Sequence, residues 1–222
     1  FFVRDVPPKG TIELKQPEIY YGLKSLDHLI VRSRMQEFNF PGPDGPVYTH
    51  YQGSGGVKLD TFFRRFLYAW KFKDINILIS GEVTEDSLIQ YRRTVSERFS
   101  TVSPFLTPDR EAYSVVADGR LFWIQDAYTT ASRYPYSTPW EDSFNYIRNS
   151  VKAVIDAYNG NINYYVADPD DPLIQTYQAI FPELFQPMED MPESLKSHVR
   201  YPQDLFTVQA EMLLQYHMRD PV

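Results

Sequence analysis

FNYIRNSVKAVIDAYNGNINYYVA, residues 144–167, is the stretch from which the fold is predicted. Apolar side chains recur in its first half at the spacing that puts them on one face of an α-helix: Phe144, Ile147, Val151, Val154, Ile155 and Tyr158. Asn159–Gly160 would end this helix, because glycine tolerates the left-handed backbone found at helix ends. The apolar run Ile162–Val166 then follows as a short strand. A helix that leads directly into a strand predicts helices packed on a sheet.

Further strands and helices are expected on both sides of this stretch. The strand candidates are part of Thr11–Tyr21, His28–Ser33, Val47–Tyr51, and the two arms of a hairpin, Tyr113–Ala117 and Arg120–Asp126. Asp118–Gly119, between these arms, is a pair that two-residue hairpin turns prefer. The helix candidates are Leu59–Phe72, Thr84 to Val102, Leu173–Ile180, and a last helix that starts at Pro202 and buries Leu205, Val208, Met212, Leu213 and Tyr216.

Together these elements predict an α+β fold, in which short strands, including a hairpin, pack against several amphipathic helices. The strands do not alternate regularly with helices, as a doubly wound parallel sheet would require. We expect residues 1–222 to form a single soluble domain cut from a longer membrane protein, and a subdivision near residues 104–112 stays open.

Composition excludes several classes of function. The net charge of −7 argues against nucleic-acid binding, which needs a basic face. The chain has no cysteine, which excludes thiol chemistry and cysteine-ligated zinc. Its four histidines are far apart and show no metal-binding spacing, and no nucleophile-elbow or phosphate-loop motif occurs. We therefore expect no cofactor, and a non-catalytic role is favoured over an enzyme.

Eight motifs, in one order along nearly the whole chain, carry a family resemblance. They are PEIYYG (17–22), FFRRFLYAW (62–70), DGRLFWIQDAYTT (118–130), SRYPYS (132–137), NYIRNSVKAVIDAYNG (145–160), YVADPDDP (165–172), FPELF (181–185) and RYPQDLFTVQAEM (200–212). The chain resembles uncharacterised protein family 0182, a family of bacterial multi-pass membrane proteins. The resemblance implies that transmembrane helices precede a large soluble region, of which this chain would be part. It implies no settled activity.

The loop expected over Ala127–Trp140 is the leading candidate for ligand binding. Its candidate residues combine aromatic rings, hydroxyls and one guanidinium group: Tyr128, Thr130, Arg133, Tyr134, Tyr136 and Trp140. Such side chains could hold a glycan, a peptide or an anionic group of the cell envelope. The alternative is a structural loop whose rings pack on the rest of the chain.

Asp168, Asp170 and Asp171 are the candidate metal ligands, because hard cations bind clustered carboxylates. Their spacing lacks the glycine and the distal glutamate of a calcium loop. The favoured alternative makes Asp171 the N-cap of a helix that starts at Pro172.

The amphipathic segment Leu59–Lys73 has two interpretations. Its aromatic face, with Phe62, Phe66 and Trp70, could lie on a bilayer, with the basic residues on the other side. We favour burial of this face in the core, because most amphipathic helices face a core.

Two functions are thus carried forward. The first is a non-catalytic, extracytoplasmic ligand-binding or assembly domain of an integral membrane protein, whose partner is the transmembrane region of the same protein. The second is a hydrolase of cell-envelope polymers that uses loop carboxylates, such as Asp118 and Asp126. The oligomeric state and the ligand are not predicted.

Overall fold

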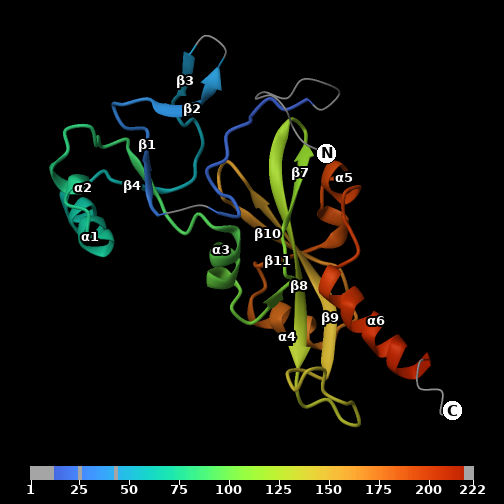
Figure 1. Ribbon diagram of the computed structural model, residues 1–222. Coiled ribbons are helices and arrows are strands. Elements are labelled where there is room, and N and C mark those ends of the chain that lie inside the picture. Colours follow the sequence, from blue (N-terminus) through green and yellow to red (C-terminus); the bar gives the residue numbers. More distant parts are fainter. Residues whose placement is uncertain (1–12, 25–26, 43–44, 218–222) are drawn as a thin grey trace. The chain divides into compact units, whose positions relative to one another are not determined.

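The computed structural model describes residues 13–24, 27–42 and 45–217, and the chain divides into two compact units. Unit 1 comprises Phe1–Glu97, Asp118–Leu121 and Asp156–Asn161, and unit 2 comprises the rest (Figure 1). The units are compact bodies of one chain, and the single domain over residues 1–222, with its subdivision near 104–112, stays a prediction.

Unit 1 contains two small antiparallel sheets. In the first, β5 (Leu88–Gln90) lies between β1 (Leu29–Val31) and β4 (Val57–Lys58). The second is the hairpin of β2 (Glu37–Gly42) and β3 (Gly45–Thr49). All three residues of β5 are buried, as expected for the central strand of a sheet.

Two helices complete unit 1, α1 (Phe62–Phe72) and α2 (Asn76–Ile79). The side chain of Thr61 caps α1 by accepting a hydrogen bond from the amide of Arg64, and Lys73 ends it in the left-handed conformation. Ala69 of α1 and Ile77 of α2 join the buried side chains Leu59, Val83 and Ile89 in one core.

Unit 2 is built on a six-stranded sheet. Five strands follow the order β11 (Phe185–Pro187), β10 (Ile162–Val166), β9 (Tyr146–Asp156), β8 (Arg120–Ala131) and β6 (Thr107–Pro108), and β7 (Tyr113–Ala117) also pairs with β8. The turn of the β7–β8 hairpin is Asp118–Gly119, whose φ angles of 53° and 76° are those of a type I′ turn. The predicted hairpin and its turn are therefore confirmed.

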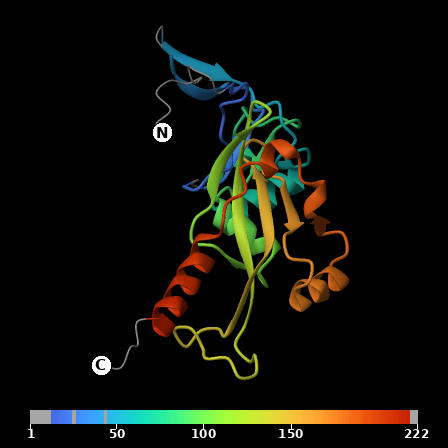
Figure 2. The ribbon, with the colours of Figure 1, turned by 90° about the vertical axis from the view of Figure 1, so that its right-hand side faces the viewer.

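The helices of unit 2 are α3 (Val95–Val102), whose first three residues belong to unit 1, α4 (Pro172–Ile180), α5 (Glu193–Lys196) and α6 (Gln203–His217), with the 3₁₀ turn η1 (Met188–Asp190). Figures 1 and 2 show α4 and α6 on opposite sides of β8 and β9. Helices therefore lie on both sides of these strands, and helices and strands do not alternate regularly along the chain. The predicted α+β class is confirmed.

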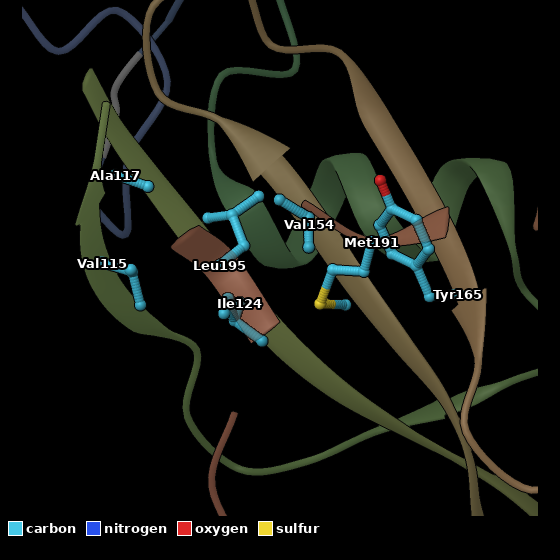
Figure 3. Close-up of a cluster of buried hydrophobic side chains, with 7 residues drawn as sticks. All are labelled: Val115, Ala117, Ile124, Val154, Tyr165, Met191 and Leu195. Atoms are coloured by element: carbon cyan, nitrogen blue, oxygen red, sulfur yellow. The ribbon is translucent and has the colours of Figure 1, made fainter. Parts of the chain in front are cut away.

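One face of the sheet packs against η1 and α5 (Figure 3). Val154 of β9 and Tyr165 of β10 meet Met191 and Leu195 there, and Ile124 of β8 extends the cluster. On the other face, the ring of Phe99 in α3 lies 5.9 Å from that of Tyr164. The sheet is thus covered on both faces, and the central strands are buried.

The predicted helix over residues 144–158 is wrong, because Tyr146–Asp156 forms strand β9. Every side chain from Ser150 to Asp156 is buried, since both faces of the sheet are covered. A strand buried on both faces has no alternation of apolar and polar residues, so its apolar positions can fall at helical spacing by chance. The three β-branched residues Val151, Val154 and Ile155 are the signal for a strand.

Two other segments also differ from prediction. The helix expected from Thr84 to Val102 is strand β5 followed by α3, and the amide of Thr84 donates to Ser87 Oγ in a turn instead of starting a helix. No strand forms in the part of Thr11–Tyr21 that the structure describes, residues 13–21.

The terminal helix is confirmed, but not its whole predicted buried side. Val208 is buried, whereas Leu213 is 58% exposed, and the side chain of Tyr216 lies outside the described residues.

Candidate functional site

The residues predicted to form one binding loop are divided between a strand and a loop. Tyr128 and Thr130 lie on β8, which continues to Ala131, and the loop proper follows over residues 132–145. Thr130 Oγ1 lies 3.2 Å from Thr107 Oγ1 on β6. These two β8 residues therefore belong to the sheet, and the loop contributes only Arg133, Tyr134, Tyr136 and Trp140.

Tyr128 is buried and helps to hold the start of α6. Its hydroxyl donates to Asp109 Oδ2 over 2.5 Å and accepts from the amide of Leu205 over 3.3 Å. The same Asp109 oxygen accepts from the amides of Gln203 and Asp204. Burial, together with the bond to Asp109, raises the pKa of Tyr128. Tyr128 and Asp109 together accept hydrogen bonds from the backbone amides in the first turn of α6, which have no partner within the helix.

Within the loop, Tyr134 and Trp140 contact other elements. The ring of Tyr134 stacks on Tyr146 of β9 at 5.3 Å, and Trp140 Nε1 donates to Glu211 Oε2 of α6 over 2.8 Å. Asn145 closes the loop, because its side chain bonds the backbone of Tyr134 and Ser137.

Arg133 and Tyr136 are exposed, and Tyr136 has a φ of 60°. The left-handed backbone is unusual for a residue with a bulky side chain. Tyr134 is also 53% exposed, so three of the predicted loop residues are open to solvent in the loop that joins β8 and β9, shown in yellow in Figure 2.

Asp171 is fully buried and acts as the N-cap of α4, which confirms the favoured capping interpretation. Its Oδ2 accepts from Thr129 Oγ1 at 2.5 Å and Ser150 Oγ at 2.6 Å, and its Oδ1 accepts from the Tyr146 hydroxyl at 2.5 Å. Burial alone would raise the pKa of Asp171, but the hydrogen bonds from Ser150, Thr129 and Tyr146 outweigh it and hold the pKa below its usual range.

The other two aspartates of this segment are more open. Asp168 Oδ2 pairs with Arg148 Nη1 at 2.8 Å, and Asp170 is exposed. Across residues 13–24, 27–42 and 45–217, no three His, Cys, Asp or Glu side chains are grouped so that they could hold a metal ion.

A buried charged cluster in unit 2 was not found by sequence reasoning. Lys152 of β9 forms an ion pair with Asp126 of β8, and both side chains are only 5% exposed. Lys152 Nζ also donates to the carbonyl of Arg200 over 3.3 Å. Burial raises the pKa of Asp126, against the opposing effect of Lys152. No spacing along the sequence could indicate this pair, because it forms across two strands.

Beside this ion pair lies a cavity of about 200 Å³. Its lining residues come from the segment between β6 and β7, from β7 and β8, and from the start of α6 and the segment before it: Asp109, Glu111, Ala112, Tyr113, Asp126, Arg200, Tyr201 and Gln203. Its two buried carboxylates already have structural roles, in the pair with Lys152 and at the start of α6.

The most unusual surface of unit 1 is the outer face of α1. Phe62, Phe63 and Trp70 are 74%, 66% and 73% exposed, and Phe66 and Leu67 are also exposed. At 3.6 residues per turn, these five side chains fall within an arc of about 140°. The prediction that the aromatic face of Leu59–Lys73 is buried is therefore wrong.

The opposite face of α1 explains this outcome. Ala69 is buried there, and Tyr68 and Phe72 pack against the core of unit 1. Because Tyr68, Ala69 and Phe72 supply the contacts of α1 with the core, the side chains of the other face are left outside. A pattern of apolar residues identifies an amphipathic helix but does not show which of two apolar faces the core will cover.

Basic residues lie close to this outer face. Arg64 pairs with Asp60 at 2.9 Å, and Lys71 Nζ lies 4.1 Å from the centre of the Tyr91 ring. Next to α1, an open cavity of about 500 Å³ is lined by three cations, two carboxylates and three rings: Asp27, His28, Lys71, Phe72, Tyr91, Arg92, Arg93 and Glu97.

Comparisons with known proteins confirm the resemblance found in the sequence. The model of the family described as Uncharacterised protein family (UPF0182) matches residues 1–222. A UPF0182 protein of Sulfurovum sp. (strain NBC37-1) is 49% identical over 99% of this chain and 25% of its own length. One of Synechococcus sp. (strain JA-2-3B'a(2-13)) is 48% identical over 100% and 27%, and one of Methanospirillum hungatei JF-1 is 46% identical over 100% and 26%.

The chain thus spans about a quarter of the length of the curated relatives it matches. No solved structure matches it. In the part of the chain that the structure describes, no helix is both long enough and apolar enough to cross a membrane.

Proposed function

Since this chain belongs to the uncharacterised protein family UPF0182, we propose that it is a non-catalytic assembly region of a larger integral membrane protein. The region would lie outside the cytoplasm and dock against the membrane part of the same protein or the membrane itself. The resemblance to multi-pass membrane proteins supports this proposal.

The single observation that carries the proposal is the outer face of α1. Five large apolar side chains are exposed on one helix, while the opposite side of that helix fills the core. A contiguous apolar surface of this kind marks an interaction site rather than a catalytic one. Assembly explains why such a surface is retained at the cost of solubility.

Cysteine accessibility in the larger protein tests both the docking through α1 and the placement outside the cytoplasm. The 222 residues contain no cysteine, so Phe66→Cys and Ser100→Cys can each be the one reporter in this region, in a background without other cysteines. Ser100 is exposed on α3 and serves as the control. A membrane-impermeant maleimide is added to intact cells, to membranes and to the purified region.

The proposal predicts that Ser100→Cys is labelled in intact cells. It also predicts that Phe66→Cys is protected in membranes but reacts as fast as Ser100→Cys in the purified region. Equal labelling of both positions in membranes would contradict docking through α1. Labelling of Ser100→Cys only after cell lysis would contradict the extracytoplasmic placement.

The loop over residues 132–145 supports a second, ligand-binding role for the same region. Arg133 and Tyr136 are exposed, and the strained backbone of Tyr136 is a feature often kept for function. We propose an envelope glycan or peptide as the ligand. Muropeptides should raise the melting temperature of the protein, and Arg133→Ala or Tyr136→Ala should abolish that rise. A rise that survives both substitutions would place the ligand elsewhere.

A further inference from the structure

We infer that the outer face of α1 docks directly on a lipid bilayer that contains anionic headgroups, an inference that rests on the assembly function proposed above. Its apolar side chains would enter the region between headgroups and acyl chains, and the basic residues around it would meet the lipid phosphates. The helix would lie in the plane of the membrane rather than cross it.

The geometry of α1 fits insertion into a bilayer surface. Phe62, Phe66 and Trp70 follow one another at one-turn intervals, and the rings of Phe66 and Trp70 meet edge to face at 5.9 Å. Close by in the chain, Ile75 before α2 and Ile79 at its end are also exposed, at 58% and 69%. Trp favours the interface between lipid and water, where its apolar ring and its polar N–H are both satisfied, and Phe and Leu are typical of the apolar face of helices that lie in this interface.

The local charge is complementary to anionic lipid. Residues 58–75 carry five Lys or Arg and two Asp, a net charge of +3, although the whole chain has a net charge of −7. Lys71 and Lys73 lie at the end of α1 and are exposed.

A second copy of this chain is a poorer occupant of the face. Two copies packed through α1 would bring two surfaces of net charge +3 together, and like charges oppose such contact. A bilayer with anionic headgroups instead attracts the basic rim and takes up the rings. The charge therefore favours lipid over self-association.

Vesicle flotation tests this inference with two lipid compositions, phosphatidylcholine alone and an equal mixture of phosphatidylcholine and phosphatidylglycerol. The protein should float with the mixed vesicles and should dissociate as salt is raised. The double variant Phe66→Ser/Trp70→Ser should bind the mixed vesicles about a hundredfold more weakly, because two exposed rings no longer enter the lipid. Lys71→Gln/Lys73→Gln should lose about tenfold to thirtyfold.

Phe206→Ser is the matched control, since Phe206 is 63% exposed on α6, a different helix, and should not affect flotation. Thermal unfolding of each variant shows that it is folded. Equal loss of binding in Phe206→Ser would overturn the assignment to α1, and no binding to mixed vesicles by the folded protein would overturn the inference itself. If vesicles do not bind but Phe66→Cys is still protected in the larger protein, protein covers α1, and the proposed function stands without this inference.

Discussion

At the scale of single residues, Asp171 joins three parts of unit 2. Its carboxylate accepts hydrogen bonds from the hydroxyls of Thr129 on β8 and of Ser150 and Tyr146 on β9, and it also caps α4. A buried acceptor of this kind is costly to remove, because each donor it serves would lose its partner.

Asp171→Ala should therefore destabilise the protein by about 2–4 kcal/mol at neutral pH. Because the pKa of Asp171 in the folded state lies below its unfolded value, its contribution is present above about pH 4 and is lost as the pH falls further. Urea unfolding of the wild type and the variant at several pH values measures the difference. Asp170→Ala, at an exposed neighbour, should change stability by less than about 0.5 kcal/mol. An effect equal to that of Asp171→Ala would contradict the capping role.

The ion pair of Lys152 and Asp126 gives a second prediction at this scale. Lys152→Met leaves a buried carboxylate without its counter-ion, which should cost about 3–5 kcal/mol at neutral pH. Since burial already raises the pKa of Asp126 above its unfolded value, this loss should shrink as the pH falls and Asp126 takes up a proton.

The double variant Asp126→Leu/Lys152→Met removes both charges and should be more stable than Lys152→Met alone. Denaturant unfolding of the two single variants and the double variant forms the required cycle. A double variant whose loss of stability relative to the wild type equals the sum of the two single losses would show that the pair is not coupled.

At the scale of elements, the turn from β9 to β10 lies in unit 1 and depends on Gly160. Its φ is +73°, and an added Cβ would lie 2.6 Å from the ring of Tyr21. The carbonyl of Ala157 in this turn accepts from the amides of Tyr20 and Tyr21, both at 2.9 Å. The turn and the segment before β1 are therefore fitted closely together within unit 1.

Gly160→Ala should destabilise the protein by about 2 kcal/mol or more, from the left-handed backbone and the clash together. Gly81→Ala is the matched control, because nothing lies within 4 Å of an added Cβ and the backbone is unstrained. The melting temperature should fall for the first variant and change little for the second. Equal melting temperatures would contradict the fit described here.

Elements with strong local signals were predictable from the sequence. Asp118–Gly119 specifies its turn, and Asp171–Pro172 specifies the start of α4, because the chemistry of these positions acts within a few residues. Strand β9 was not predictable in this way, since its burial depends on segments far along the chain, such as η1 and α5, where Met191 after η1 and Leu195 in α5 meet Val154. Tyr128 was expected in a loop but lies on strand β8, because the end of that strand also depends on pairing with distant parts of the chain.

At the scale of the whole molecule, the main finding is a surface that the sequence left ambiguous. Residues 59–73 could bury or expose their aromatic side, and only the packing of Tyr68, Ala69 and Phe72 decides between the two. The six loop candidates could be chosen from the sequence as aromatic, hydroxyl and guanidinium side chains, but they do not share one loop, because Tyr128 and Thr130 lie on strand β8 before it.

Because the side chains of the outer face of α1 are exposed, their substitution should weaken membrane binding without lowering the free energy of unfolding by much. Phe66→Ser/Trp70→Ser should change the free energy of unfolding by less than about 1 kcal/mol, because neither ring belongs to a buried core. A large loss of stability would instead show that these rings support the fold. Denaturant unfolding of this variant, compared with Phe206→Ser, makes the measurement.

Fluorescence of Trp70 at the membrane surface tests the central claim most directly. The chain has three tryptophans, and Trp123→Phe/Trp140→Phe leaves Trp70 as the reporter on α1. Vesicles of phosphatidylcholine and phosphatidylglycerol, with and without bromine on the acyl chains near the headgroups, are added to this variant. We predict a shift of the Trp70 emission to shorter wavelength and quenching by the brominated lipid. Emission that stays that of a water-exposed indole, with no quenching, would contradict docking of α1 on the bilayer.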